Sequence, residues 1–572
     1  MKKKKEYMER LFLSLVDGLD IIEVVGNNCQ VDSIEYDSRK VKPGAVFCAL
    51  PGLHVDGKSF IQDAIQKGAT AILHEAELTD FVSGVCYARV KDVRFAMSYI
   101  SAQFYDEPSK KLKVIGVTGT EGKSSTVSFI WQLLNLLGEK CGYFSTVSYA
   151  YGGIDTEEKN PEHQTTPESC TVQERLYRMQ EAGSTYAVVE SSSHGLSEKT
   201  ARLAHVLFDA GVWLNVTEEH LEFHKTFENY RNDKANLFRK LDEHDHKKCF
   251  IPMRHLQSQE QVGTCSCESA VECCEDCRDC MYETVPSFCV INLDDVSANW
   301  FSQVGKTPKY GFTVQKNNAK TDLAQRLPFV LVATNISETT NGICFTLEAY
   351  SFGTQLKSDI LAIPITVPLV GYFNVQNVLA SILTVMHISG IAFERIIQVL
   401  ANLKPITGRM FFVNEGQDFT VIIDYAHTPS SFETIMPSLA TVTHRTGKKL
   451  ISVFGSGGER DTTKRPEQGR IASQYCDIVI LADEDPRGED SMELLNMIAA
   501  GVQGKELDKT LFLIPDRKAA IRKAFSLCEP GDMVLLLGKG HENSIIFKDY
   551  VMPYDEETEA RCALKELLHA NT

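Results

Sequence analysis

The sequence predicts an α/β fold in three domains: a small N-terminal α/β domain, a central domain with a P-loop ATPase-like parallel sheet, and a C-terminal Rossmann-like domain. The first observation is size, because 572 residues with 43% apolar side chains can form several hydrophobic cores, and one core rarely exceeds about 250 residues. The second is a strand, glycine-rich loop and helix pattern that starts at Leu112. The third is a series of apolar strands that end in polar loops after residue 404. We expect the boundaries to give domains 1–111, 112–403 and 404–572.

Composition restricts the partners of the protein. A net charge of −17 and a pI near 5.4 argue against a nucleic-acid or anionic-membrane surface, since both partners need clustered positive charge. The basic start is interrupted by Glu6 and Glu9, and no run of roughly 18 apolar residues is present, so we expect neither an export signal nor a membrane span. The 17 cysteines are then best interpreted as thiols or metal ligands. We expect a cytoplasmic monomer that binds small molecules.

The N-terminal domain contains one segment that suits a nucleotide. Asp37-Ser38-Arg39 precedes a strand-like run that Pro43-Gly44 and Pro51-Gly52 bracket as turns. A serine hydroxyl and a planar guanidinium on such loops can bind a diphosphate. A solvated turn explains the same three residues equally well, so both interpretations stay open for this segment taken alone.

The clearest pattern is the phosphate loop, which we define as residues 119–125. A buried strand, Val114–Val117, precedes it, and an apolar helical pattern follows. Such a loop can direct backbone N–H groups and a helix N-terminus at a phosphate, with Lys123 near the β- and γ-phosphates and Ser124 ligating Mg²⁺. Two residues separate the two glycines of the loop, so the spacing differs from the standard Walker A pattern. A glycine-rich turn with a solvated lysine is the alternative.

A second polar cluster follows an apolar strand. Residues 187–190 read AVVE, and a carboxylate at the end of a parallel strand is a typical Mg²⁺ ligand in an open sheet. An N-cap cluster for the next helix explains Glu190 and the serines behind it equally well. Downstream, His220 follows a strand-like run and Lys234 lies in a helical pattern. Taken singly, Lys234 would be interpreted as a solvated helix lysine.

The order of these motifs resembles the Mur ligase family: the phosphate loop, E-x-S-S-H from Glu190, H-L-x-x-H from His220, and K-A-x-x-F from Lys234. The resemblance covers nearly the whole chain and implies an enzyme that forms an amide bond with ATP. It implies that Glu190 and His220 ligate a second Mg²⁺. It also implies that CO₂ converts Lys234 to a carbamate, an anion able to ligate the metal. One departure is Glu121, which stands where the family most often carries asparagine.

The resemblance also implies sets of functional residues. The ATP set is Gly119, Thr120, Glu121, Gly122, Lys123, Ser124, Ser125, Asn374, Asn377, Arg409 and Asp424. The set for a UDP-muramoyl-dipeptide is Ser38, His54, Thr165, Thr166, Ser192 and Arg202. The set for the incoming amino acid is Arg460, Asp485, Pro486, Arg487, Gly538 and Glu542. The catalytic set is Lys123, Glu190, His220 and Lys234, and the metal ligands are Ser124, Glu190, His220 and Lys234.

The incoming amino acid is expected to be a diamino acid. An α-amino acid needs a cation for its carboxylate, and a distal ammonium needs an acid. Diaminopimelate carries a second carboxylate, which Arg487 could bind. Family members that add diaminopimelate resemble D-N-P-R at this loop, whereas this chain has Glu484-Asp485-Pro486-Arg487. The extra acid favours the bare ammonium of lysine or ornithine, so the choice among the three stays open.

A cysteine-rich insertion, residues 253–287, departs from the family pattern. Six thiols lie within sixteen residues, and Cys274, Cys277 and Cys280 have the close spacing of metal ligands. They could supply a tetrahedral Zn²⁺ site. Two C-x-x-C motifs with a proper loop between them are missing, so a polar surface insertion with reduced thiols is the favoured interpretation. We expect the chemistry not to depend on this insertion.

The implied reaction belongs to peptidoglycan precursor synthesis. A D-Glu γ-carboxylate attacks the γ-phosphorus of ATP, and an amine then displaces phosphate from the resulting acyl phosphate. Carboxylate and triphosphate repel each other, so two Mg²⁺ ions and Lys123 are expected to neutralise charge. The nearest alternative is a ligase of the same superfamily that adds a dipeptide or a glutamate. Alternatives from other classes are a nucleotide-binding regulator without chemistry and a metal-binding interaction protein built on the cysteines.

Overall fold

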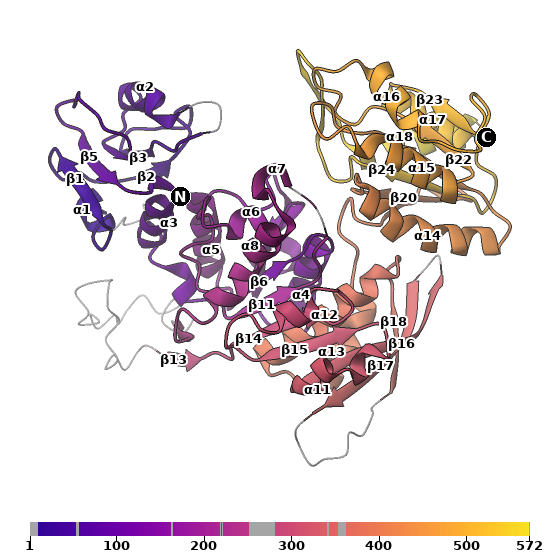
Figure 1. The fold of residues 1–572 in the computed structure, drawn as a ribbon, viewed down its shortest axis with the longest axis horizontal. Coiled ribbons are helices and arrows are strands. Elements are labelled where there is room, and N and C mark those ends of the chain that lie inside the picture. Colours follow the sequence, from indigo (N-terminus) through magenta and orange to yellow (C-terminus); the bar gives the residue numbers. More distant parts are fainter. Residues whose placement is uncertain are drawn as a thin grey trace.

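The computed structural model describes residues 10–52, 56–161, 164–217, 219, 221–250, 281–339, 342–352 and 362–570. Figure 1 shows three α/β units that follow one another along the chain, with the central unit between the other two. The units are built on sheets of five, eleven and six strands. The α/β fold predicted from the sequence is confirmed.

The N-terminal unit has a five-stranded sheet in the order β1-β5-β4-β3-β2. β1 runs antiparallel to β5, and the other neighbours are parallel. The fully buried β3 lies between the two Pro-Gly turns, as predicted. The elements are α1 (Phe12–Leu15), β1 (Ile21–Val25), β2 (Ser33–Glu35), β3 (Ala45–Cys48), α2 (Ile61–Gln66), β4 (Ala71–His74), β5 (Cys86–Val90) and α3 (Val93–Phe104).

The central unit has an eleven-stranded sheet in the order β18-β17-β16-β15-β14-β11-β6-β10-β7-β8-β9. Its strands from β16 to β7 are parallel neighbours, and both edges continue as antiparallel strands. The strands are β6 (Lys113–Thr118), β7 (Cys141–Phe144), β8 (Ser148–Ala150), β9 (Glu157–Lys159), β10 (Tyr186–Glu190), β11 (Ala210–Trp213), β14 (Phe288–Asn292), β15 (Lys309–Thr313), β16 (Phe329–Thr339), β17 (Gly342–Ser351) and β18 (Ile363–Val367).

Helices cover both faces of this sheet. The helices are α4 (Lys123–Leu136), α5 (Ser169–Glu181), α6 (Ser193–Leu196), α7 (Leu221–His224), α8 (Phe227–Lys240), α10 (Ala298–Phe301), α11 (Asp322–Arg326), α12 (Phe373–Ser389) and α13 (Phe393–Val399). Side chains of α4 and α12 share one core with alternate residues of β6, and α5 and α8 share the core on the opposite face. α8 packs closely on β6, because a Cβ at Gly116 would lie 2.4 Å from Leu237 Cδ1. That close approach brings the middle of α8 to the phosphate loop.

The C-terminal unit has a six-stranded sheet in the order β19-β20-β24-β21-β22-β23, parallel except for β19. The elements are β19 (Phe411–Val413), β20 (Thr420–Asp424), α14 (Pro429–Arg445), β21 (Leu450–Phe454), α15 (Lys464–Tyr475), β22 (Ile478–Leu481), α16 (Ser491–Ala499), β23 (Leu511–Leu513), α17 (Arg517–Ser526), β24 (Met533–Leu537), β25 (Ser544–Ile546), β26 (Val551–Pro553) and α18 (Glu556–Ala570). Within the described part of the chain, no helix is both long and apolar enough to cross a membrane.

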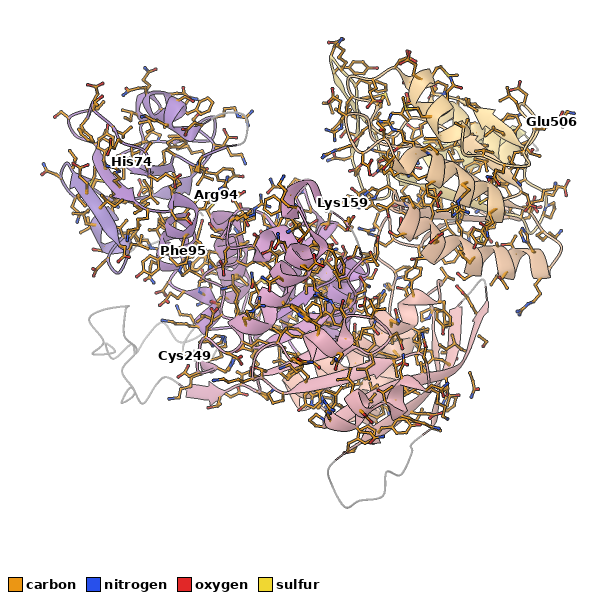
Figure 2. All side chains as sticks on the ribbon, in the orientation of Figure 1. His74, Arg94, Phe95, Lys159, Cys249 and Glu506 are labelled. Carbon is orange, nitrogen blue, oxygen red and sulfur yellow. The ribbon has the colours of Figure 1, made fainter. Side chains whose placement is uncertain are left out.

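Side-chain contacts join the units at both junctions. On α3, Arg94 approaches Glu168 at 3.7 Å, and the Phe95 ring centroid lies 4.7 Å from that of His205. Figure 2 labels both α3 residues where the N-terminal unit meets the central one. At the other junction, Lys159 of β9 forms an ion pair of 2.8 Å with Asp555.

Residues 251–280, which include most of the cysteine-rich insertion and all six of its thiols, lie outside the described residues, so the predicted thiol cluster stays a prediction. The chain on either side of residues 251–280 is described. Strand β12 (Lys247–Phe250) pairs antiparallel with β13 (Met281–Thr284), so the chain leaves and re-enters the central unit at one place.

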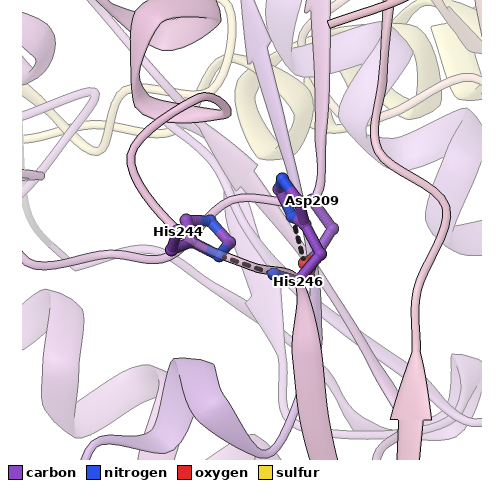
Figure 3. A group of neighbouring side chains, drawn as sticks. All are labelled: Asp209, His244 and His246. Carbon is purple, nitrogen blue, oxygen red and sulfur yellow. Dashed lines mark hydrogen bonds and ion pairs between the residues drawn. The ribbon is translucent and has the colours of Figure 1, made fainter.

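A buried polar network anchors β12 to the amino ends of the central parallel strands. Figure 3 shows three of its members, Asp209, His244 and His246. The fully buried Asp209 accepts hydrogen bonds from the Val114 amide and Lys248 Nζ, both at 2.8 Å. His246 Nδ1 lies 3.1 Å from its other oxygen. The Nε2 atoms of His246 and His244 lie 2.7 and 2.8 Å from backbone carbonyl oxygens. Asp209, His244 and His246 lie close enough together to hold a cation. Their ring nitrogens and the carboxylate, however, already have hydrogen-bond partners.

We expect Lys248→Met to lower the free energy of unfolding by about 3 kcal/mol, because it leaves a buried carboxylate with less compensation. Urea denaturation followed by far-UV circular dichroism measures the change. Lys247→Met is the matched control, since Lys247 is more than half exposed and its ion pair with Asp245 spans 4.0 Å. An exposed pair of that kind contributes about 0 to 1 kcal/mol. Equal effects of the two variants would contradict a structural role for the network.

Candidate active site

The phosphate loop has the predicted strand–loop–helix setting, between β6 and α4. Asn215 holds it from outside, because its Oδ1 accepts hydrogen bonds from the backbone amides of Thr120 and Glu121 at 2.9 and 2.8 Å. Gly122 has φ of +82°, and a Cβ there would lie 2.5 Å from Asn377 Oδ1. Only glycine satisfies both conditions without strain. The loop conformation is therefore fixed by a side chain 94 residues away.

Lys123 and Ser124 begin α4 and face different groups. Lys123 Nζ donates to the Thr120 carbonyl at 2.7 Å, so the ammonium lies over its own loop. The Ser124 hydroxyl lies 3.0 Å from each carboxylate oxygen of Glu190, at the end of β10. Thr146 adds its amide at 2.7 Å and its hydroxyl at 3.1 Å. Buried carboxylate and hydroxyl oxygens are the hard ligands that Mg²⁺ prefers, so this donor set fits that ion. The predicted ligand His220 lies outside the described residues.

Lys234 is buried on α8 and directed at the phosphate loop. Its Nζ lies 2.6 Å from the Gly119 carbonyl oxygen and 4.4 Å from the ring centroid of Tyr230. Burial, and then the charge of Lys123, lower the pKa of Lys234 well below its ordinary value. A neutral amine is thereby favoured, and the neutral amine is the form that reacts with CO₂.

Glu121 adds an acid to the loop. Burial and the neighbouring Glu219 raise the pKa of Glu121, while Lys123 and Arg409 oppose that rise. A raised pKa reduces the negative charge that Glu121 presents to a bound phosphate. The unusual residue is therefore compatible with an anion at this loop.

A cavity of about 400 Å³ lies between the phosphate loop and the C-terminal unit. Its size is that of a small-molecule site. Of the predicted ATP set, all members except Gly119 line it: Thr120, Glu121, Gly122, Lys123, Ser124, Ser125, Asn374, Asn377, Arg409 and Asp424. On the C-terminal side of the cavity, the Arg409 guanidinium lies 4.7 Å from the Tyr425 ring centroid. Asp424 accepts a hydrogen bond from the Met410 amide at 2.8 Å. The structure thus gathers this predicted set from two units.

Part of the predicted UDP-muramoyl-dipeptide set is gathered next to Glu190. Thr166 Oγ1 donates to the Glu190 carbonyl at 2.9 Å, and the Ser192 hydroxyl donates to Thr166 Oγ1 at 3.0 Å. Arg202 donates to the Thr166 carbonyl at 2.9 Å. Thr165 lines the cavity. Ser38 is not brought to this cluster, since it lies in the N-terminal unit between β2 and β3, and His54 lies outside the described residues.

The predicted amino acid set forms a second cluster beside the cavity. The fully buried ammonium of Lys539 lies 2.9 Å from Asp485 Oδ1 and 2.6 Å from Glu542 Oε2. Burial alone would lower the pKa of Lys539, but Glu542 and Asp485 raise it. The Tyr425 hydroxyl, from the cavity wall, lies 3.3 Å from Glu542. Tyr425 therefore connects the 400 Å³ cavity to the cluster of Asp485, Lys539 and Glu542.

Two charged atoms of this second cluster are buried and, within the described part of the chain, have no hydrogen-bond partner: Glu484 Oε2 and Arg487 Nε. Gly538 leaves room beside the acid, because a Cβ there would lie 2.9 Å from Glu484 Oε2. Pro486 and Arg460 are on adjoining loops, joined by the hydrogen bond from the Gly458 amide to the Asp485 carbonyl at 2.8 Å. A buried carboxylate oxygen and a buried guanidinium nitrogen without partners can bind an ammonium and a carboxylate, respectively.

Sequence reasoning did not single out Asn215, Thr146 or Lys539. A sequence feature was available for two of them. Thr146 follows the end of β7, where ligands gather in parallel sheets, and Lys539 adjoins Gly538. Asn215 begins the N-x-x-x-x-H segment before His220, but its contact with the phosphate loop is a tertiary one that no local pattern predicts.

Family models match most of the chain. The Mur ligase middle domain matches residues 117–262, the glutamate ligase domain of Mur ligases matches 408–540, and the Mur ligase family catalytic domain matches 30–105. A UDP-N-acetylmuramyl-tripeptide synthetase of Treponema denticola is 51% identical over 96% of both chains. A UDP-N-acetylmuramoyl-L-alanyl-D-glutamate–2,6-diaminopimelate ligase of Geobacillus thermodenitrificans is 34% identical over 95% of this chain and 96% of its own.

Solved structures share the fold. A UDP-N-acetylmuramoyl-L-alanyl-D-glutamate–2,6-diaminopimelate ligase aligns with a TM-score of 0.58 and 24% identity, covering 98% of this chain and 100% of that one. A MurF ligase of Thermotoga maritima in complex with ADP aligns with a TM-score of 0.57 and 19% identity, covering 95% and 99%.

Proposed function

The chain belongs to the Mur ligase family, and from this membership we propose that it joins a diamino acid to the D-Glu of UDP-N-acetylmuramoyl-L-Ala-D-Glu. It is an ATP-dependent ligase of peptidoglycan precursor synthesis, as the names of its relatives indicate. The observation that carries the finer assignment is the pair of unpartnered charged atoms on Glu484 and Arg487, next to the acids that share Lys539. This cluster adjoins a nucleotide-sized cavity through Tyr425.

In the proposed reaction, the D-Glu γ-carboxylate attacks the γ-phosphorus of ATP, and ADP leaves. The amine of the diamino acid then attacks the acyl carbon, loses a proton and displaces phosphate. Lys123 neutralises charge as the phosphoryl group moves, and the backbone amides of the phosphate loop orient the phosphates. Bound Mg²⁺ would supply further neutralisation, held by Ser124 and Glu190.

Lys234 is proposed to act as a carbamate. Its neutral amine attacks CO₂, forms an N–C bond and releases one proton, so that a buried neutral group becomes an anion. The support is the depressed pKa of Lys234, its burial and its position at the phosphate loop. A carbamate there would be a further oxygen ligand for Mg²⁺, whereas an ammonium would be repelled.

The reaction requires a diamino acid. We expect purified protein with ATP, Mg²⁺ and UDP-N-acetylmuramoyl-L-Ala-D-Glu to release phosphate with at least one of meso-diaminopimelate, L-lysine and L-ornithine, and to stay at background with L-alanine. L-alanine lacks the distal ammonium that Glu484 would receive. Phosphate release and product mass are the measurements.

The diamino acid that supports turnover identifies the residues that determine specificity. Turnover with diaminopimelate alone would assign Arg487 to the second carboxylate, and Arg487→Gln should then raise KM for diaminopimelate. Turnover with lysine or ornithine would assign specificity to the acids Glu484 and Asp485. Background rates with all three diamino acids would overturn the proposed substrate class.

A further inference from the structure

A hydrogen-bonded relay of serine, histidine and aspartate lies behind the candidate active site. His224 ends α7, and its side chain is completely buried. Its Nδ1 lies 2.8 Å from Asp233 Oδ2, and its Nε2 lies 3.1 Å from Ser193 Oγ. The order is that of the triads that activate a serine nucleophile.

This relay is not placed for nucleophilic chemistry. Ser193 is 2% exposed and lies outside the residues that line the 400 Å³ cavity. The His224 ring is enclosed by rings of His194, Phe223 and Tyr230, at centroid distances of 5.1, 4.7 and 5.0 Å. Among the described residues, no open path therefore leads a substrate carbonyl to the hydroxyl.

The relay instead joins three segments that carry proposed catalytic groups. Ser193 follows Glu190 by three residues, and Asp233 directly precedes Lys234. His224 follows His220 by four residues in the same motif. The chain bends immediately afterwards, where Lys225 has φ of +71°. Asn229 Nδ2 fixes that corner by donating to the His224 carbonyl at 3.0 Å.

We propose that Ser193, His224 and Asp233 are positioning residues that hold the Lys234 helix in register with the Glu190 loop. The carboxylate of Asp233 places a proton on His224 Nδ1, so Nε2 accepts from the Ser193 hydroxyl and each bond has a fixed direction. Successive helix residues point about 100° apart, so Asp233 and Lys234 hold α8 from two directions. Asp233 bonds to His224, and Lys234 donates to the Gly119 carbonyl. Rotation of α8 about its axis is thereby opposed from two directions.

This inference rests on the proposed roles of Lys234 and Glu190. The test distinguishes a failure of the positioning role from a failure of the proposed function. Ser193→Ala, His224→Ala and Asp233→Asn are compared with the wild-type protein. His205→Ala is the matched control, a substantially buried histidine between the N-terminal and central units that packs on Phe95 and Tyr99. Loss of groups that orient ligands typically costs about 10- to 100-fold in activity or metal affinity, and we expect that range for His224→Ala and Asp233→Asn in kcat. KM for the diamino acid should stay within about twofold, because that pocket lies on another unit.

Amide hydrogen exchange supplies a readout that does not depend on turnover. The relay variants should exchange faster in residues 191–196 and 221–240 than wild type, with unchanged rates in the C-terminal unit. ¹³C NMR in labelled bicarbonate should show less carbamate, with Lys234→Ala as the blank. Should His224→Ala fail to fold, the near-isosteric Ser193→Ala and Asp233→Asn decide.

Unchanged exchange in both segments together with unchanged kcat in the relay variants would overturn the positioning role. An equal loss in His205→Ala would also overturn it, since that would reveal general destabilisation. Wild-type protein that ligates none of the diamino acids would instead overturn the proposed function, and the exchange comparison would still test the tether.

Discussion

Lys234→Ala is expected to lower kcat about 100- to 1,000-fold, the loss seen when one preorganised group that stabilises transition-state charge is removed. The side chain is buried at the phosphate loop, 2.6 Å from the Gly119 carbonyl oxygen, so its removal leaves a small hole at that loop. A short carboxylic acid such as formate or acetate can enter that hole and supply the anion that the proposed carbamate would provide. We therefore expect partial recovery of kcat in formate, measured by phosphate release at saturating substrates.

The matched control is Lys240→Ala. Lys240 lies on the same helix, and its ammonium donates to the Ala204 carbonyl away from the cavity. Formate should leave this variant and wild type unaffected. Lys234→Arg should not be recovered, because a guanidinium stays protonated and forms no carbamate. Full activity of Lys234→Ala without additives would contradict the role proposed for the residue.

The parts of the site predicted from sequence are those encoded by consecutive residues. The strand at Val114–Val117 and the helix from Lys123 follow from local periodicity, and both are present as β6 and α4. Glu190 was a candidate because it ends an apolar strand, and the carboxyl ends of parallel strands meet at one edge of a sheet. In each case a short-range rule also determines the position in the fold.

What escaped prediction depends on partners far apart in the chain. Asn215 reaches the amides of Thr120 and Glu121 from 95 and 94 residues away, and Lys539 reaches Asp485 from 54 residues away. No periodicity reports such pairs, because they arise only when strands from separate segments become neighbours. The relay illustrates the same limit, since Ser193 and His224 are 31 residues apart and each alone is typical of a packed core.

The effect of Glu121 also required tertiary information. The sequence alone predicts that Glu121 places a negative charge next to a bound phosphate. In the structure, burial and Glu219 raise its pKa, and the C-terminal unit contributes Arg409 from across the cavity. The charge that a phosphate meets is therefore set by two units together, which is consistent with a site that is complete only when they lie against each other.

Lys123→Ala is expected to lower kcat about 1,000-fold, at the upper end of the loss for a preorganised transition-state charge. In the structure the ammonium lies 2.7 Å from the Thr120 carbonyl, a single hydrogen bond to its own loop, whereas Asn215 holds the same loop independently. Alanine should therefore preserve the loop and remove only the charge. Phosphate release measures kcat, and the unchanged melting temperature of the variant is the check on the fold.

Lys123→Arg tests whether a positive charge at this position is sufficient or whether the compact ammonium of lysine is also needed. The guanidinium keeps the positive charge but spreads it over a larger planar group, so we expect an intermediate kcat, higher than that of the alanine variant. Lys140→Ala is the control, since Lys140 is exposed and its ammonium donates to the Ala182 carbonyl, away from the cavity lining. If Lys123→Ala retained wild-type kcat, neutralisation of the transferring phosphoryl group would have to come from elsewhere, and the cavity residue Arg409 would be the first cation to replace.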